Sequence, residues 1–319
     1  MTAEMPPKFG FVAIVGRANA GKSTLVNRLV GEKVAIVSPR PQTTRQRIQG
    51  IVNRDDAQMV LVDTPGIHKP ENALGKQMMN EVRDALEGVD VLCLIVDARD
   101  VSPERLGPED RFVLNYVKRF SGTAFLLLNK VDGLHKEKLL PIIEFYGRQH
   151  GFAEIIPISA LKGAGIEDLL RTLVKYLPEG EPQFPADQYT DQPQRFLAAE
   201  IIREKAILIT RQEVPHSIAV LVDSFAEGAK LTRIRATIYV EREGQKGIII
   251  GKGAASLKRI GTDSRLELES LLGTKVFLDL HVKVQPHWRE NRAMVSQLDW
   301  RQQLGAMSDA EEELDEEQA

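Results

Sequence analysis

The 319-residue chain has little cysteine and no long hydrophobic run, and each absence excludes a class of protein. Its one cysteine, Cys93, cannot form an intramolecular disulfide, and its place in the apolar run 91–96 is typical of a small buried hydrophobe. No apolar stretch approaches the roughly 20 residues that span a bilayer, and residues 1–8 lack the hydrophobic region of a signal peptide. We therefore expect a cytoplasmic protein.

Basic residues are absent from the end of the chain. No Lys or Arg follows Arg301, and seven acids lie between Asp309 and Glu317. We expect residues 305–319 to form an acidic, disordered tail. Residues 194–304 carry 18 Lys and Arg against 13 Asp and Glu, so this region is mildly basic although the net charge of the chain is −3.

The length allows two domains, and the pattern of apolar residues divides the chain in the same way. Over residues 1–177, strand-length apolar runs alternate with helical periodicity, which predicts an α/β domain with a mostly parallel sheet and helices on both faces. The expected strands are 9–15, 59–62, 91–96, 124–128 and 155–158. The four later strands end in polar clusters, which are 63–66, 97–99, 129–132 and 159–162. Most of these clusters should share one ligand site at the carboxyl edge of the sheet.

The second half has a different pattern. Residues 178–193 contain four prolines and no periodicity, which predicts a linker. The elements expected beyond it are a helix at 196–210, strands at 217–225 and 234–240, helices at 255–260 and 263–272, and a strand at 275–284. This order, α-β-β-α-α-β, predicts an α+β domain over residues 194–304.

The segment Gly16–Ser23 has the spacing G-x-x-x-x-G-K-S of a phosphate-binding loop. A surface glycine turn with an incidental Lys-Ser is the alternative, but the strand before the segment and the helix after it favour a nucleotide site. Lys22 should bridge the β- and γ-phosphates, and Ser23 should bind Mg²⁺. The nucleotide-binding residues expected from this loop are Gly16, Ala18, Asn19, Ala20, Gly21, Lys22, Ser23 and Thr24.

The sequence Asp63-Thr64-Pro65-Gly66 follows a hydrophobic strand. Alone it is more often an ordinary turn, but after a phosphate loop it favours a metal site. The acid can reach Mg²⁺ directly or through water, and the Gly66 N–H can contact the γ-phosphate.

The sequence Asn129-Lys130-Val131-Asp132 predicts which base is bound. A carboxylate at Asp132 can accept two hydrogen bonds from the N1–H and N2–H₂ edge of guanine, whereas adenine would leave it unpaired. Asn129 should brace the loops, and the stem of Lys130 should lie along the purine. Ser159, Ala160 and Leu161 should complete the pocket, with the Ala160 N–H facing the guanine O6. The predicted ligand is therefore GTP or GDP.

Together, GRANAGKS, DTPG, NKVD and SALKG resemble the motifs of translation-factor-class GTPases, and DTPGIHKP with PQTTR resembles the Era family. By this resemblance the metal-binding switch threonine is Thr43 or Thr44, and we favour Thr44. Residues 36–47 match the first switch, and residues 66–79 match the second. The implied metal ligands are Ser23, Thr44 and Asp63, and the implied catalytic residues are Lys22, Thr44, Gly66 and Asn19.

One position departs from the Ras-like scheme, in which a glutamine after D-x-x-G orients the attacking water. Here that position is Ile67, whose apolar side chain cannot position water. We therefore expect slow intrinsic hydrolysis. Related GTPases with an asparagine at the position of Asn19 can use a bound K⁺ as the missing positive charge, and K⁺ dependence is a hypothesis for this chain.

The order of elements after the linker resembles a type II KH domain, which binds single-stranded RNA through a G-x-x-G loop. Gly251-Lys252-Gly253-Ala254 stands where this loop belongs, but alanine replaces its last glycine. Because alanine is a good helix former, we expect the next helix still to start there and the groove to narrow slightly. The basic residues expected near the RNA phosphates are Arg233, Lys252, Lys258 and Arg259, and Ile249 and Ile250 should line an apolar groove that binds bases. The loop residues expected at RNA are Gly251, Lys252, Gly253 and Ala254. The alternative is that these charges are only solvated.

The resemblance covers residues 9–300 and implies an Era-like GTPase that binds the 3′ end of 16S ribosomal RNA during assembly of the small (30S) subunit. It implies Mg²⁺ and GTP or GDP as cofactors, with peripheral contact with the membrane as a further option. It does not imply an oligomer, so we expect a monomer. Two alternatives remain open. The first alternative to the Era-like function is a constitutive RNA-binding protein with a structural nucleotide site, and the second is a GTPase of the membrane surface.

Overall fold

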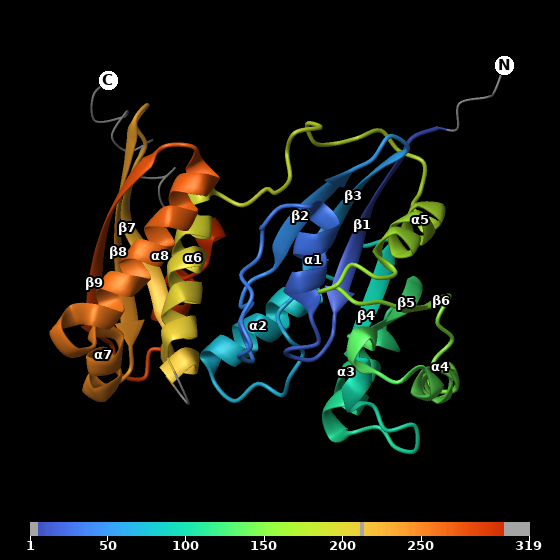
Figure 1. The fold of residues 1–319 in the computed structure, drawn as a ribbon. Coiled ribbons are helices and arrows are strands. Elements are labelled where there is room, and N and C mark those ends of the chain that lie inside the picture. Colours follow the sequence, from blue (N-terminus) through green and yellow to red (C-terminus); the bar gives the residue numbers. More distant parts are fainter. Residues whose placement is uncertain (1–5, 211–213, 303–319) are drawn as a thin grey trace. The chain divides into compact units, whose positions relative to one another are not determined.

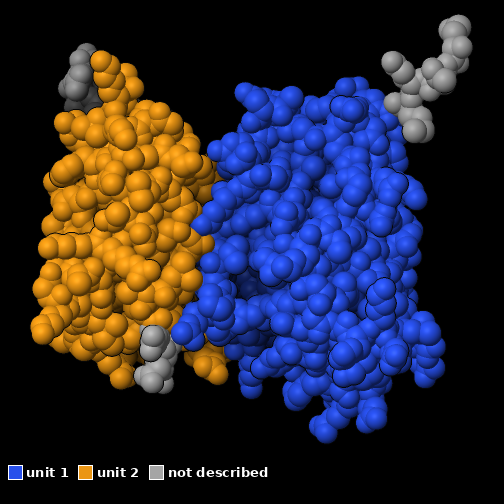
Figure 2. Space-filling view, in the orientation of Figure 1, with its two compact units in different colours: residues 1–69, 78–191 blue, residues 70–77, 192–319 orange. Residues whose placement is uncertain are grey.

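The computed structural model describes residues 6–210 and 214–302. The described chain forms two compact units (Figure 2). Unit 1 comprises residues up to 69 together with 78–191, and unit 2 comprises residues 70–77 together with those from 192 onward. The predicted tail at 305–319 and the last two residues of the predicted second domain lie outside the described residues. Of the helices within the described ranges, none is both long and apolar enough to span a membrane.

Unit 1 is built on a six-stranded sheet with the strand order β2-β3-β1-β4-β5-β6 (Figure 1). Only β2 and β3 pair antiparallel, and every other neighbouring pair is parallel. The strands are β1 (Lys8–Val15), β2 (Ile48–Asn53), β3 (Ala57–Asp63), β4 (Val91–Asp97), β5 (Thr123–Asn129) and β6 (Glu154–Pro157). The predicted α/β class with a mostly parallel sheet is thus observed.

Helices cover both faces of this sheet. Leu126 of β5 belongs to a buried cluster with residues of three of the helices, whereas its neighbour Phe125 packs edge-on against Tyr176 of the last helix, with ring centroids 5.0 Å apart. Because successive side chains of a strand point to opposite faces, these helices lie on opposite sides. The helices are α1 (Lys22–Val30), α2 (Ala73–Asp84), α3 (Pro108–Val117), α4 (Leu139–Gly147) and α5 (Ile166–Tyr176).

Strand β2 was not predicted from the sequence. This edge strand forms a hairpin with β3, and Ile48 pairs with Asp63 at one end of the register. Its alternation is interrupted at Gly50, where a Cβ atom would lie 2.7 Å from Val30 of α1. The glycine that lets the helix pack closely on the strand therefore also hides the strand's hydrophobic pattern.

The segment predicted as a linker is bound to unit 1 over most of its length. Phe184 and Gln183 donate their backbone N–H groups to Oε1 of Gln58, and Thr190 bridges to Gly50. The backbone carbonyl of Pro178 accepts a hydrogen bond from Phe9. Residues 178–191 are therefore an extended strap along the sheet, and unit 2 resumes at residue 192.

Unit 2 packs helices on one face of a three-stranded sheet with the order β7-β8-β9. Strands β7 and β8 are antiparallel, and β8 and β9 are parallel. The elements are α6 (Gln194–Ile209), β7 (Ala219–Ala226), β8 (Leu231–Val240), α7 (Glu243–Ile250), α8 (Ala255–Leu272), β9 (Lys275–Val284) and α9 (Arg292–Gln297). This is the expected α+β order.

Two details of that order were wrong. Residues 255–260 and 263–272, expected as two helices, form the single helix α8, because Gly261 is tolerated within it. The helix that follows β8 is instead α7, which ends at Ile250 directly before the glycine loop. After β9, the buried Trp288 anchors the chain by donating its indole N–H to the carbonyl of Ser217 at 2.8 Å.

Candidate functional site

A cavity of about 570 Å³ lies in unit 1 at the carboxyl ends of the parallel strands. Most of the residues that line it come from the phosphate-loop segment, the segment 36–44, Gly66, the end of β4 and Lys130, and the rest include residues of α3 and α4. Asn129, Asp132 and residues 159–161 lie outside this lining. The predicted convergence of several strand ends on one ligand site is therefore present.

The phosphate loop leads directly into α1. Gly21 stands before the first helical residue with φ of +102°, and a Cβ atom here would lie 2.3 Å from Nδ2 of Asn129. Both the left-handed backbone and the close approach of Asn129 exclude other residues at this position. The N–H groups of the first helical turn are thereby left available for an anion.

Three predicted metal ligands from separate segments meet beside this loop. The Ser23 hydroxyl donates to Oδ2 of Asp63 at 2.7 Å, and the Thr44 hydroxyl donates to the same oxygen at 3.3 Å. The hydroxyls of Ser23 and Thr44 are 2.8 Å apart. The position of Thr44 therefore favours it over Thr43 as the metal-binding threonine, since Thr43 instead donates to the carbonyl of Arg40.

The charges in this cluster are buried. Burial lowers the pKa of the Lys22 ammonium to about 8, although the Asp63 carboxylate opposes this shift. Burial raises the pKa of Asp63 to about 6, although Lys22 and the hydrogen bonds from Ser23 and Thr44 act in the opposite direction. The Lys22 ammonium donates to the backbone carbonyls of Gly16 and Arg17.

The residues of this cluster fit a magnesium ion. Mg²⁺ prefers oxygen ligands and is usually held by one or two carboxylates together with substrate phosphates and water. Here two hydroxyls and one carboxylate converge, and Oδ1 of Asp63 is buried without a hydrogen-bond partner among the described residues. An unpaired buried carboxylate oxygen is costly unless a cation or donor reaches it. When bound, Mg²⁺ supplies charge neutralisation at the phosphates.

Asn129 braces the loops as predicted. Its side-chain Nδ2 donates to the carbonyl of Ala20 at 2.8 Å, and its Oδ1 accepts the backbone N–H of Ala160 at 2.9 Å. The second bond changes one expectation. The Ala160 N–H, which we expected to face the guanine O6, is directed to Asn129 in this structure.

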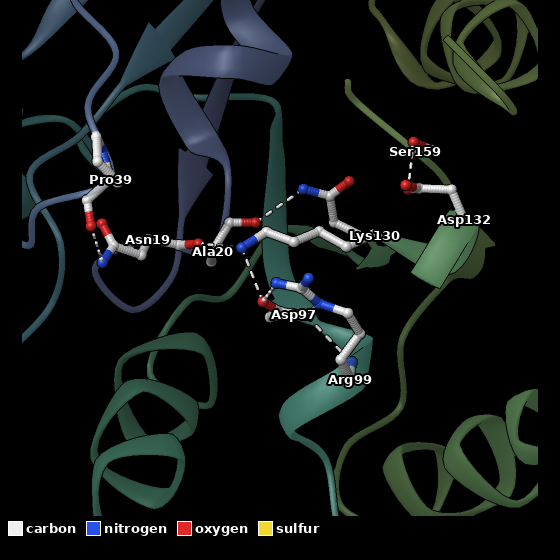
Figure 3. A network of polar contacts seen from close by, with 9 residues as sticks. Asn19, Ala20, Pro39, Asp97, Arg99, Lys130, Asp132 and Ser159 are labelled. Carbon is white, nitrogen blue, oxygen red and sulfur yellow. Dashed lines mark hydrogen bonds and ion pairs between the residues drawn. The ribbon is translucent and has the colours of Figure 1, made fainter. Parts of the chain in front are cut away.

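Asp132 is exposed and is oriented by Ser159, whose hydroxyl donates to its Oδ1 at 2.6 Å (Figure 3). This hydrogen bond is the main cause that lowers the pKa of Asp132. The carboxylate is therefore ionised and available as an acceptor at neutral pH, as guanine recognition requires. Lys130 reaches back from the same loop and donates to the carbonyl of Asn19 at 2.6 Å.

The two residues connected with slow hydrolysis lie in different surroundings. Ile67 is buried, and its N–H donates to the carbonyl of Gly16 at 3.0 Å, so its side chain is part of the core. Asn19 is exposed with φ of +62°, and its Nδ2 donates to the carbonyl of Pro39 at 3.2 Å. The side chain of Asn19 therefore joins the phosphate loop to the segment predicted as the first switch.

Three side chains at this site had no role predicted from the sequence. Arg28 of α1 supports the loop 159–161 by donating to the carbonyls of Ala160 and Leu161. Asp97 and Arg99 lie beside Lys130 at the end of β4 (Figure 3). The polar cluster 97–99 was visible after its strand, but its residue types match no motif.

In unit 2 the predicted RNA-binding loop connects α7 and α8 with an unusual backbone. Gly251, Gly253 and Ala254 have φ values of +71°, +60° and +62°. The next helix, α8, does start directly after this alanine, as expected. Ala254 itself lies before the helix in a left-handed conformation that glycine adopts more readily, so helix propensity is not the reason that alanine is accepted there. Lys252 on this loop is exposed, as are Lys258 and Arg259 on α8.

Two other residues of the predicted RNA set lie elsewhere. Ile249 is fully buried in the core of unit 2 and cannot line an open groove, whereas Ile250 is partly exposed. Arg233 is exposed on β8, next to the buried Ile234 that packs in the core beneath the helices. Because strand residues alternate between faces, Arg233 lies on the helix-free face of the sheet, away from Lys258 and Arg259.

Comparisons with known proteins agree with this geometry. Residues 11–130 match the family model described as "50S ribosome-binding GTPase", and residues 213–289 match the KH domain. The chain is 52% identical over 293 residues to GTPase Era of Lactobacillus helveticus (strain DPC 4571), covering 91% of this chain and 95% of that relative. The chain belongs to the Era family of GTPases.

Solved structures of Era have the same fold. One is Era in complex with MgGDPNP and nucleotides 1506–1542 of 16S ribosomal RNA, which is 44% identical, covers 92% of this chain and 99% of that one, and has a TM-score of 0.88. Another is a variant of Aquifex aeolicus Era bound to GDP.AlF4⁻, with the same identity and coverage and a TM-score of 0.87. The predicted P-loop GTPase domain followed by a KH domain is thus confirmed.

Proposed function

We propose that this chain is a GTP-hydrolysing switch that binds the 3′ end of 16S ribosomal RNA and assists assembly of the 30S subunit. The observation that supports it most is the Era complex that holds MgGDPNP and a 16S ribosomal RNA fragment together, at 44% identity over 92% of this chain. The Ser23, Thr44 and Asp63 oxygens match the first ligand, and the cationic loop at Lys252 matches the second. A protein with this partner acts in the cytoplasm.

In this proposal each group of the nucleotide site has a separate task. Lys22 binds the β- and γ-phosphates, and the Ser23, Thr44 and Asp63 oxygens hold Mg²⁺. Asp132 selects guanine, and Gly66 contacts the γ-phosphate. Since Ile67 cannot orient a water molecule, hydrolysis is slow unless another group orients the water or supplies positive charge at the phosphates.

We propose that the second switch carries the signal to unit 2. Residues 70–77, which follow Gly66 closely and include the start of α2, group with unit 2, whereas α2 from Met78 onward groups with unit 1. Within unit 2 the Leu74 N–H donates to the carbonyl of Arg289 at 3.0 Å. Contacts that Gly66 gains from a γ-phosphate therefore act on a segment anchored in both units.

The hypothesis that K⁺ assists hydrolysis stays tied to Asn19. Its place between the phosphate loop and Pro39 would let a cation beside it approach the phosphates. Hydrolysis should be faster in KCl than in NaCl at equal ionic strength, and Asn19→Ala should remove the difference. Equal rates in the two salts would contradict the hypothesis.

Fluorescence anisotropy with an RNA matching the 3′ end of 16S ribosomal RNA tests the proposed partner. Lys252→Glu should weaken binding and reduce the slope of log affinity against log salt by about one. Lys230→Glu is a matched control, because Lys230 is exposed in the loop between β7 and β8. Equal losses of RNA affinity in the two variants would show that binding depends on the net charge of the chain and not on the glycine loop.

RNA binding in the presence of different nucleotides, together with vesicle sedimentation, separates the two alternatives. A constitutive RNA-binding protein would bind the RNA equally well with GDP and with a non-hydrolysable GTP analogue. A GTPase of the membrane surface would show no salt-dependent RNA binding and would instead sediment with anionic vesicles. Either result would contradict the proposed function.

A further inference from the structure

The carboxylate of Asp97 joins several groups at the end of β4 (Figure 3). Its Oδ2 lies 2.7 Å from the Lys130 ammonium and accepts a hydrogen bond from Nη2 of Arg99 at 2.8 Å. Its Oδ1 accepts the Nε–H and the backbone N–H of Arg99, at 2.9 and 3.1 Å. The Asp97 side chain is only 10% exposed, so these groups replace water around it.

The sheet register explains why Asp97 and Lys130 meet. Asp97 of β4 is the parallel partner of Asn129 of β5, so the ends of these strands lie side by side. The next residue, Lys130, has a left-handed backbone with φ of +65°. Its ammonium is held between the carbonyl of Asn19 at 2.6 Å and the carboxylate of Asp97 at 2.7 Å.

Asp97 remains charged over the whole physiological pH range. Burial alone raises the pKa of Asp97, but the hydrogen bonds from Arg99 and Lys130 outweigh it and lower the pKa to about 2. The acceptor that faces Lys130 is therefore a full negative charge, which makes a stronger hydrogen bond than a neutral group.

Arg99 extends the same network to the turn after the base-reading residue. A Cβ atom on Gly133 would lie 3.0 Å from Cδ of Arg99, so the arginine packs against this turn. The positive charge of Arg99 also acts on the pKa of Asp132. Asp97 thus holds two cations that flank the guanine-binding loop. Lys130 lies on the side expected to face the purine, and Arg99 lies at the turn of Gly133.

We propose that Asp97 is a positioning residue for the nucleotide base. It holds the Lys130 ammonium beside Asn19, so that the long and flexible stem of Lys130 forms a fixed wall along the purine. This inference rests on the proposed function, since it requires a guanine nucleotide in the cavity. Because Asp97 acts on the base and not on the phosphates, its effect should be the same for GDP and for GTP.

A double-mutant cycle with a fluorescent GDP tests the proposal. Asp97→Asn preserves the size of the side chain and removes its charge, and it should weaken GDP binding about tenfold, the loss expected for one charge-assisted hydrogen bond. A non-hydrolysable GTP analogue should lose affinity by the same factor. In a Lys130→Met background the same substitution should have almost no effect, because the group that Asp97 positions is absent.

Asp55→Asn is the matched control, because it removes one negative charge at an exposed position between β2 and β3 that does not line the cavity. It should change GDP affinity by no more than about twofold. Thermal unfolding without nucleotide shows whether each variant is folded.

Unchanged GDP affinity in Asp97→Asn would overturn the proposal. An equal loss in the Lys130→Met background would also overturn it, because Asp97 would then act through the fold and not through Lys130. If the unmodified chain fails to bind GDP, the proposed function itself fails, and this result is distinguishable from both outcomes above.

Discussion

In unit 1 the polar side chains of the nucleotide site bind one another, whereas in unit 2 the cations near the glycine loop face solvent. Ser23, Thr44 and Asp63 form a buried cluster, and Asn129 is hydrogen-bonded at both ends. Lys252 and Lys258 are exposed. The side chains of the first region are held in place by one another, and the second region presents charge on a strained backbone.

This difference predicts how each region responds to substitution. Removing one partner of a buried hydrogen bond costs a large binding or folding free energy, because the group left behind is unpaired. Removing an exposed cation costs little affinity, and the contribution of such a cation to RNA binding falls as the salt concentration rises. Changes in the nucleotide site should therefore act on affinity and specificity, and changes near the loop should act on stability and salt dependence.

The largest effect is expected for Asp132→Asn. The amide cannot accept both hydrogen bonds from the guanine edge, so GDP affinity should fall roughly 100-fold. The amide can instead donate to the oxygen at C2 of xanthine, so xanthosine diphosphate should bind better than GDP. Competition titrations measure both, and the exposed Asp55→Asn variant is the control. Unchanged preference for guanine would show that Asp132 does not read the base.

A smaller effect is expected from pH on Mg²⁺ binding. The pKa of Asp63 is raised from 3.8 to about 6, so a proton competes with Mg²⁺ for this carboxylate below pH 6. Mg²⁺ affinity of the GDP-bound chain should fall about tenfold per pH unit there and stay level above it.

Magnesium titrations between pH 5 and pH 8 check this expectation, and Asp63→Asn measures the part that comes from the nucleotide phosphates. A decline that begins only near pH 4 would mean that the carboxylate keeps its ordinary pKa and that its burial has no effect on the metal site.

The smallest effect is expected in the glycine loop of unit 2. Ala254 has φ of +62°, so Ala254→Gly should raise the free energy of unfolding of unit 2 by about 1 kcal/mol. Ala255 is the matched control, because it has φ of −62° in the first turn of α8, where glycine should lower stability by about 0.5–1 kcal/mol.

Urea unfolding followed by tryptophan fluorescence measures both variants. The two tryptophans of the chain, Trp288 and Trp300, belong to unit 2, so the signal reports on this unit alone. Equal changes of the same sign at both alanines would show that the left-handed backbone of Ala254 is not strained.

The sequence predicted the nucleotide site better than the RNA-binding region, for a physical reason. Phosphate, metal and guanine each demand particular atoms at particular spacings, so Lys22, Asp63 and Asp132 are visible as motifs. A groove for RNA demands mainly charge and shape, and whether Ile249 is buried or Arg233 faces the loop depends on packing. The burial of Ile249 was accordingly missed, whereas the RNA contact expected of Arg233 stays a prediction.

Features set by tertiary contacts were also beyond the sequence. Strand β2 is hidden by Gly50, which makes room for α1. Asp97 is an ordinary polar residue after a strand until the register of β4 and β5 brings it to Lys130. Residues 70–77 carry no signal that they group with unit 2.

The proposed switch requires that the nucleotide bound by unit 1 changes the RNA affinity of unit 2. The most direct test is the affinity of the full chain for the 16S ribosomal RNA 3′-end fragment, measured with GDP and with a non-hydrolysable GTP analogue at one salt concentration. We predict at least about fivefold tighter binding with the GTP analogue, the lower end of typical allosteric coupling. Equal affinities would contradict the proposed switch, because a ligand shifts an equilibrium only by its differential affinity.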